Sequence, residues 1–139
     1  MRKAIYIELC EELAKIAPIK GNRRVFLTNS GAEAVETAVK LARVRTGRQK
    51  IVGFFGGFHG RTYGAMTLTA SKPVQRKGYG PFVPEVLHTH YAYCYRCPVN
   101  RQPDSCKVEC LDLLTDSYFH HSVDPSEVAA VIVEPVQGE

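Results

Sequence analysis

Apolar residues along this chain recur at helical spacing in four segments, which predicts four helices. The first covers residues 4–16 and ends before Pro18, and two further ones cover Thr62–Ala70 and Cys106–His120. The clearest helix begins after Ser30. Its apolar stripe comprises Val35, Ala38, Val39 and Ala42.

Short apolar runs bounded by turn residues predict strands between these helices. They are Val25–Leu27, Lys50–Phe55, Glu85–His90 and Ala129–Val133. Helices that alternate with buried strands are typical of an α/β fold with a largely parallel sheet, so we expect that class here.

The turn at residues 29–33 combines a helix cap with a possible anion site. Ser30 and Glu33 have the spacing of a capping box, so we expect the Ser30 hydroxyl to accept from the Glu33 amide and the Glu33 carboxylate to bind the Ser30 amide. Further along the helix, Glu36 is expected to pair with Lys40 on the solvent side. Free amides at a helix start attract anions, and Gly31 leaves room for one. A capped helix without a ligand is the alternative interpretation.

Three segments with candidate chemistry follow predicted strands. They are residues 29–32, the glycine-rich loop 56–62 and residues 134–139 at the end of the sequence. Ligand-binding loops of parallel sheets lie at the carboxyl ends of the strands. We therefore expect the three segments to converge on one pocket.

Composition narrows the class of protein. At 139 residues the chain is one domain at most, and 45% hydrophobic residues suffice for a core. Its net charge of +4 comes from scattered basic residues, which argues against a nucleic-acid interface. No apolar run approaches a membrane span, and the acidic residues in the first helix argue against a signal peptide. The sequence therefore predicts a cytoplasmic protein with reduced thiols.

Four of the five cysteines have the spacing Cys94-x2-Cys97-x8-Cys106-x3-Cys110. Four thiols that close could bind zinc or an iron–sulfur cluster, and disulfides are possible in a thermophile. Free thiols are the simpler interpretation, so no metal ligand is assigned. Cys10 is expected in the core of the first helix.

The three strand-end segments carry a family resemblance. The motifs NSGAEAVETAVKLAR, FGGFHGRTYGAMTLTASK and AAVIVEPVQGE, in this order, resemble the class III pyridoxal-phosphate-dependent aminotransferases. The resemblance is strongest to the 4-aminobutyrate, acetylornithine and ornithine aminotransferases. It extends from about Leu9 to Glu139.

The resemblance implies the large domain of a fold-type I enzyme, a mainly parallel sheet between helices. Residues 1–139 are similar to an internal piece of this pyridoxal-phosphate-binding domain. The family's Schiff-base lysine, the aspartate that pairs with the pyridine nitrogen and the gating arginine would all lie beyond Glu139. We therefore assign no catalytic residue, and we expect the piece by itself to be inactive. Lys72 resembles a loop lysine.

The resemblance also implies cofactor-binding roles. Gly31 and Ala32 match the positions whose amides hold the cofactor phosphate, and Ser30 caps that helix. Phe58 matches the aromatic residue that stacks on the pyridine ring. The neighbouring His59 lines the pocket or has a structural role.

Two acids of the EPVQGE segment complete the implied site. Glu134 resembles the acid that supports the cofactor site, and burial without a partner would be costly, so we expect partners in the segment beyond Glu139. Glu139 resembles the substrate-binding glutamate that pairs with the gating arginine.

The resemblance implies transamination between an ω-amino acid such as 4-aminobutyrate and a 2-oxo acid such as 2-oxoglutarate, in a homodimer. One alternative is an amino-acid racemase or epimerase on the same scaffold, since these motifs serve the cofactor and do not separate the two reactions. The other is a non-catalytic module built around the cysteines.

Overall fold

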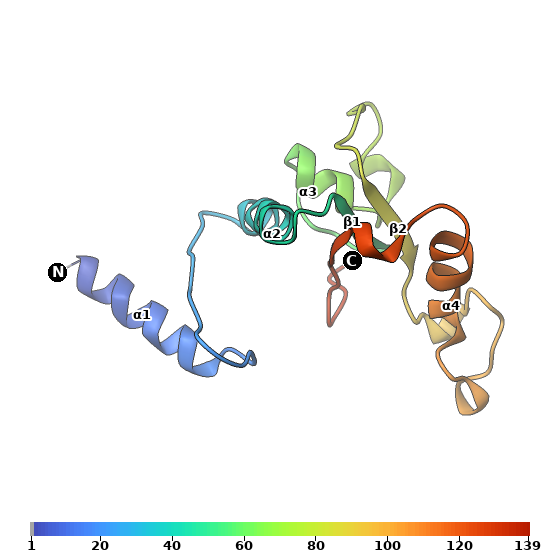
Figure 1. Ribbon diagram of the computed structural model, residues 1–139, viewed down its shortest axis with the longest axis horizontal. Coiled ribbons are helices and arrows are strands. Elements are labelled where there is room, and N and C mark those ends of the chain that lie inside the picture. The colour runs from blue at the N-terminus through green and yellow to red at the C-terminus, as the bar shows by residue number, and fades with distance from the viewer. Residues whose placement is uncertain (1) are drawn as a thin grey trace.

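The computed structural model, shown in Figure 1, describes residues 2–139. Its centre is a parallel sheet in which β1 (Lys50–Phe55) lies between β2 (Val86–His90) and β3 (Val128–Val131). Ile51 of β1 is aligned with Val86 on one side and with Ala130 on the other. The predicted α/β class with parallel strands is confirmed.

Two helices pack against this sheet and form the hydrophobic core with it. Val39 of α2 (Gly31–Thr46), Ile51 of β1 and Leu68 of α3 (Tyr63–Leu68) form one buried cluster. The other residues of the apolar stripe of α2 differ in burial. Val35 and Ala42 pack against the cluster, whereas Ala38 is exposed. Gly47 ends α2 in the left-handed conformation, as a glycine C-cap does.

The helix α1 (Arg2–Ile16) stands apart from the sheet and is joined to α2 by an extended segment (Figure 1). Its apolar stripe is therefore exposed: 64% of Ile5 and 74% of Ile16 are accessible. The strand predicted at Val25–Leu27 is wrong. These residues lie in the extended segment and pair with no strand among residues 2–139, and without a neighbour their backbone groups form no ladder.

The helix predicted over Cys106–His120 is wrong in its first part. Val108 adopts φ 66°, which a helix does not tolerate, and regular turns begin only after it. There α4 (Asp112–Leu114) continues into a π-helical turn, Thr115–Phe119. The Tyr118 hydroxyl donates to the carbonyl of His88 at 3.0 Å, which fixes this segment to β2.

Short 3-10 turns connect the longer elements. They are η1 (Pro73–Gln75), η2 (Cys94–Arg96), η3 (Pro103–Ser105), η4 (Glu109–Leu111) and η6 (Pro125–Glu127). Within residues 2–139, no helix combines the length and the apolar character that crossing a bilayer requires.

Candidate functional site

The start of α2 offers free backbone donors. The Ser30 hydroxyl accepts from the Glu33 amide at 3.2 Å, as predicted. The second half of the predicted box is wrong, because the Glu33 carboxylate reaches past Ser30 and accepts from the Asn29 amide at 2.8 Å. Within residues 2–139 no acceptor binds the amides of Gly31 and Ala32. The arrangement can therefore bind an anion.

The glycine-rich loop after β1 packs directly on this helix start. Gly60 has φ 126°, a conformation that favours glycine. A Cβ added there would lie 2.6 Å from the Cβ of Ala32, so only glycine allows the approach. This contact brings the loop that carries Phe58 and His59 to the free amides of α2.

Glu36 connects α2 to α3. Its carboxylate accepts from the Thr62 hydroxyl at 2.6 Å and from the Ala65 amide at 3.0 Å. The predicted pair with Lys40 is therefore wrong, because these donors at the start of α3 occupy the carboxylate. Gly64 makes room for this arrangement, since a Cβ there would collide with Glu36. The loop between β1 and α3 is thus held at both ends.

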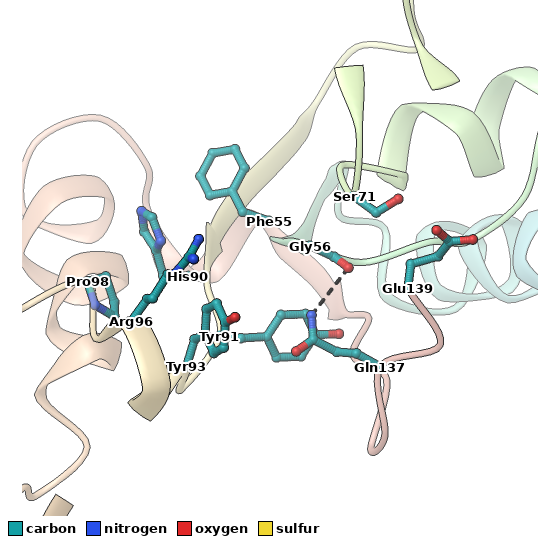
Figure 2. A pocket seen from close by; sticks show the side chains of 10 residues that line it. All are labelled: Phe55, Gly56, Ser71, His90, Tyr91, Tyr93, Arg96, Pro98, Gln137 and Glu139. Atoms are coloured by element: carbon teal, nitrogen blue, oxygen red, sulfur yellow. Dashed lines mark hydrogen bonds between the residues drawn. The ribbon is translucent and has the colours of Figure 1, made fainter. Parts of the chain in front are cut away.

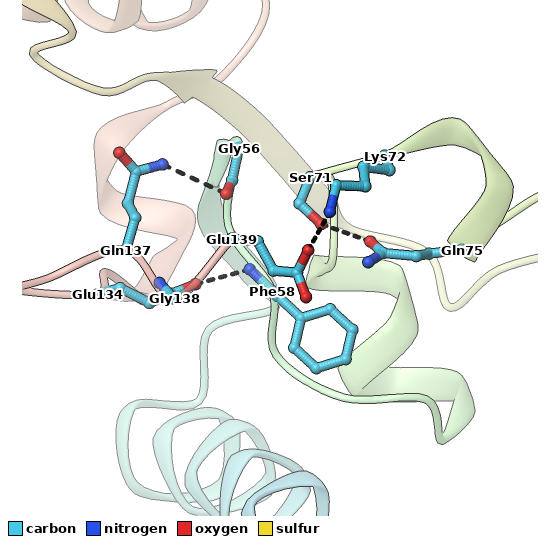
Figure 3. Close-up of polar contacts among 9 residues, drawn as sticks. All are labelled: Gly56, Phe58, Ser71, Lys72, Gln75, Glu134, Gln137, Gly138 and Glu139. Carbon is cyan, nitrogen blue, oxygen red and sulfur yellow. Dashed lines mark hydrogen bonds and ion pairs between the residues drawn. The ribbon is translucent and has the colours of Figure 1, made fainter.

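Glu134 joins that loop to the segment after β3 (Figure 3). One carboxylate oxygen accepts from the Phe58 amide at 2.6 Å, and the other accepts from the Gly138 amide at 2.9 Å. The Glu134 amide donates to the Tyr91 hydroxyl at 2.9 Å. The expectation that its partners lie beyond Glu139 is wrong, because two backbone amides of this chain satisfy the carboxylate.

His59 is a buried histidine with an unused ring nitrogen. The residue is 7% exposed, and its amide donates to the Thr69 hydroxyl at 2.9 Å. The Nε2 atom is buried and has no hydrogen-bond partner among residues 2–139. Burial lowers the pKa of His59 below its ordinary 6.5, against the opposing charge of Glu134. A neutral imidazole with a free nitrogen can accept or donate one bond to a ligand.

Phe58 and Glu139 belong to the two segments that Glu134 joins (Figure 3). Phe58 is half-buried, and its ring projects from the loop. The Glu139 carboxylate forms an ion pair with the Lys72 ammonium group. Lys72 lies at the start of η1, in the loop after α3, as its sequence context predicted.

A cavity of about 380 Å³ opens beside these residues at the carboxyl ends of β1 and β2 (Figure 2). Glu139 lines it, whereas the other predicted site residues do not. Gln137 and Tyr91 also line it, and Gln137 donates to the carbonyl of Gly56 at 3.2 Å. Sequence analysis missed both residues. Their position just after β2 and β3, where ligand loops lie, could have revealed them.

Residues 1–139 match the family described as Aminotransferase class-III. The chain belongs to the class III aminotransferase family. The family resemblance of the three motifs is thereby confirmed, and so is the fold-type I class.

The names of relatives of this chain describe several activities. A probable 4-aminobutyrate aminotransferase of Bacillus subtilis is 45% identical over 134 residues. An isoleucine 2-epimerase of Lentilactobacillus buchneri is 36% identical over 133 residues. Each match covers 96% of this chain, but the chain spans only about 30% of the length of these relatives.

Solved transaminases share the arrangement of elements. An amine transaminase from an uncultivated Pseudomonas species in its pyridoxal-phosphate-bound form superposes with a TM-score of 0.82 at 27% identity. A transaminase with L-alanine gives the same TM-score at 29% identity. These matches cover 95% and 96% of this chain, and 31% and 32% of those structures.

Class III aminotransferases depend on pyridoxal phosphate, and the residues present fit this group. The free amides of Gly31 and Ala32 suit its phosphate. The ring of Phe58 offers an aromatic face, and the unpartnered Nε2 of His59 offers a polar contact. An orphaned buried nitrogen is costly by itself, which favours a ligand at this place.

Proposed function

We propose that residues 1–139 form part of the pyridoxal-phosphate-binding domain of an aminotransferase. The observation that supports this most strongly is the Glu134 contact, which ties the Phe58 loop to the segment after β3. The Gly60–Ala32 contact adds the start of α2 to the same assembly. Three segments that are distant in sequence thus share one end of the sheet.

In this proposal each residue has a physical task. The amides of Gly31 and Ala32 hold the phosphate, and the Ser30 cap keeps them pointing outward. Phe58 stacks on the pyridine ring. The Glu134 carboxylate accepts a hydrogen bond from the Phe58 amide and so fixes the position of the Phe58 backbone. When bound, pyridoxal phosphate supplies the electron sink of the reaction.

We propose an ω-amino acid as amino donor and a 2-oxo acid such as 2-oxoglutarate as acceptor. The name of the Bacillus subtilis relative supports 4-aminobutyrate. A 5-aminovalerate aminotransferase of Pseudomonas aeruginosa, 37% identical, supports the same substrate class. Glu139 is the proposed substrate-binding acid, and its ion pair with Lys72 supports a role for this carboxylate in binding a cation.

Because the chain spans about 30% of its relatives, we infer that the Schiff-base lysine lies in sequence outside it. We further infer a cytoplasmic homodimer for the complete enzyme. Borohydride reduction of residues 1–139 with pyridoxal phosphate should then leave no stoichiometric adduct on any one lysine. Full labelling of a single lysine would contradict this assignment.

Racemisation or epimerisation is the second candidate, and the 36%-identical isoleucine 2-epimerase supports it. The two reactions are separated by assaying the full-length protein. Formation of glutamate from 2-oxoglutarate and 4-aminobutyrate supports transamination. Loss of optical rotation of a single amino acid without any 2-oxo acid supports the racemase.

A further inference from the structure

Four cysteines that are spread over seventeen positions surround one small cavity. The cavity measures about 170 Å³ and lies in the segment between β2 and α4. Its lining comprises Cys94, Cys97, Cys106 and Cys110 together with Ala92, Tyr93, Pro103 and Val108. This segment has only short turns to order it, so a cross-link here would contribute much to its stability.

Two of the four sulfur atoms already accept backbone hydrogen bonds. The Arg101 amide donates to Cys97 Sγ at 3.3 Å, and the Val108 amide donates to Cys106 Sγ at 3.2 Å. Such amide donors orient a ligand atom from outside its coordination sphere.

The other two thiols line the same cavity. Cys110 is 3% exposed, so its thiol is enclosed by the cavity wall. A bound metal ion removes the proton of such a thiol outright. Cys94 is exposed, so an ion can reach the cluster from solvent.

We propose that Cys94, Cys97, Cys106 and Cys110 bind one Zn²⁺ ion in a closed, tetrahedral structural site. Four thiolates are the ligand set of such sites, and the first pair has their usual two-residue spacing. Among residues 2–139, no three His, Cys, Asp or Glu side chains are already grouped as metal ligands. Zinc therefore draws the thiols together as it binds.

The charge and proton balance of this step is simple. Zn²⁺ replaces four thiol protons, which pass to solvent, and the site carries a net charge of −2. In the absence of metal the Cys106 thiol donates to the Glu109 carboxylate at 3.1 Å, a bond that is lost when the thiol gives up its proton. The basic residues Arg96 and Lys107 in the same segment offset the negative charge, whereas Arg101 pairs with Glu109 at 3.4 Å.

The site would also order one wall of the larger cavity. Tyr93 lines both cavities, and Arg96, which lies between the first two cysteines, lines the larger one. Zinc binding at the cysteines therefore fixes side chains that face Glu139. This inference does not depend on the substrate or on the reaction type, so it can fail without the proposed function failing.

Metal analysis of the full chain, purified without chelators and then loaded with zinc or cobalt, tests the proposal. We expect about one zinc ion per chain, and with cobalt the visible bands of a tetrahedral thiolate complex. Cys94→Ser should lower the zinc content at least about tenfold, because an open three-thiolate site binds far more weakly. Cys10→Ser, which changes a cysteine of α1 outside the cavity, should leave it unchanged.

Trypsin gives a second readout that does not require a variant. Removal of zinc by a chelator should speed cleavage after Arg96, Arg101 and Lys107, and zinc should reverse the effect. The Cys94 variant should fold because that residue is exposed. A metal-free chain with four reactive thiols, a chain with disulfides among them, or a brown protein with iron and sulfide would overturn the proposal. So would zinc content that Cys94→Ser leaves unchanged.

Discussion

The carboxylate of Glu134 holds the backbone amide of Phe58 at 2.6 Å, across 76 positions of sequence. Glu134 follows β3, whereas Phe58 follows β1, so the bond joins two loops at the carboxyl end of the sheet. The second oxygen binds the Gly138 amide and thereby orders the approach to Glu139. One acid thus sets the positions of the proposed stacking ring and the proposed substrate-binding carboxylate.

Replacing Glu134 by glutamine should destabilise the chain. The amide group of glutamine presents donors where both backbone partners are donors, so one of the two bonds is lost. Loss of a bond to a charged acceptor predicts about 1.5–3 kcal/mol less free energy of unfolding. Urea denaturation measures this. Glu8→Gln, an exposed change on α1, is the matched control, and equal effects of the two variants would contradict the account.

Alanine at Gly60 should separate the loop from α2. The added Cβ would lie 2.6 Å from the Cβ of Ala32, in a backbone conformation that alanine rarely adopts. We expect a loss of about 1–3 kcal/mol of unfolding free energy. Gly31→Ala meets no atom within 4 Å and should leave stability unchanged or slightly higher, since alanine favours helix. A stable Gly60→Ala chain would mean that the contact is unnecessary.

Removing the Glu36 carboxylate should loosen α3. Glu36→Ala leaves the Thr62 hydroxyl and the Ala65 amide without their acceptor, which predicts a loss of about 1–3 kcal/mol in thermal or chemical unfolding. Thr62→Val removes only the first of these bonds and should cost less. If Thr62→Val lowers the free energy of unfolding as much as Glu36→Ala does, the Glu36 carboxylate does not hold the start of α3 through both bonds.

Stability should fall as the pH drops through the range of about 7 to 5. Burial is the main reason why the pKa values of His59 and His88 both lie below 6.5. The unfolded chain therefore binds protons at a pH where the folded chain does not, and acid favours unfolding. The lowered pKa values of Glu85 and Glu109 act from about 4.5 downward, outside this range.

Variants of His59 and His88 test whether these residues cause the pH dependence of stability. His59→Asn and His88→Asn should each flatten the curve of unfolding free energy against pH. His121→Asn, at an exposed position, should not. Equal slopes in all four proteins would contradict the role of the buried imidazoles.

Local signals were sufficient where the partners are close in sequence. The apolar run of β1 predicted its bounds correctly, and Ser30 marked the start of α2 because a helix cap is a local feature. The same reasoning failed at Val25–Leu27, since a strand also needs a neighbour to pair with. It failed again before Val108, whose left-handed backbone no periodicity reveals.

The acids of the site show a second limit of sequence reasoning. Glu36 and Glu134 were recognised as acids that need partners, but the wrong partners were predicted. The Thr62 hydroxyl that donates to Glu36 is 26 positions away, and the Phe58 amide that donates to Glu134 is 76 positions away. Backbone amides such as that of Phe58 occur throughout every sequence, so the sequence does not single one out. Only the fold selects among such donors.

We propose that the start of α2 and the Phe58 loop together form the binding site for pyridoxal phosphate. Pyridoxamine phosphate tests this most directly, because it needs no lysine to bind. It should shift the backbone amide NMR signals of Gly31 and Ala32 and the ring signals of Phe58. Pyridoxamine should cause the same shifts only at a concentration at least about tenfold higher, because it lacks the phosphate that the amides hold. Equal responses to the two compounds, or shifts that spare Gly31 and Ala32, would contradict the account.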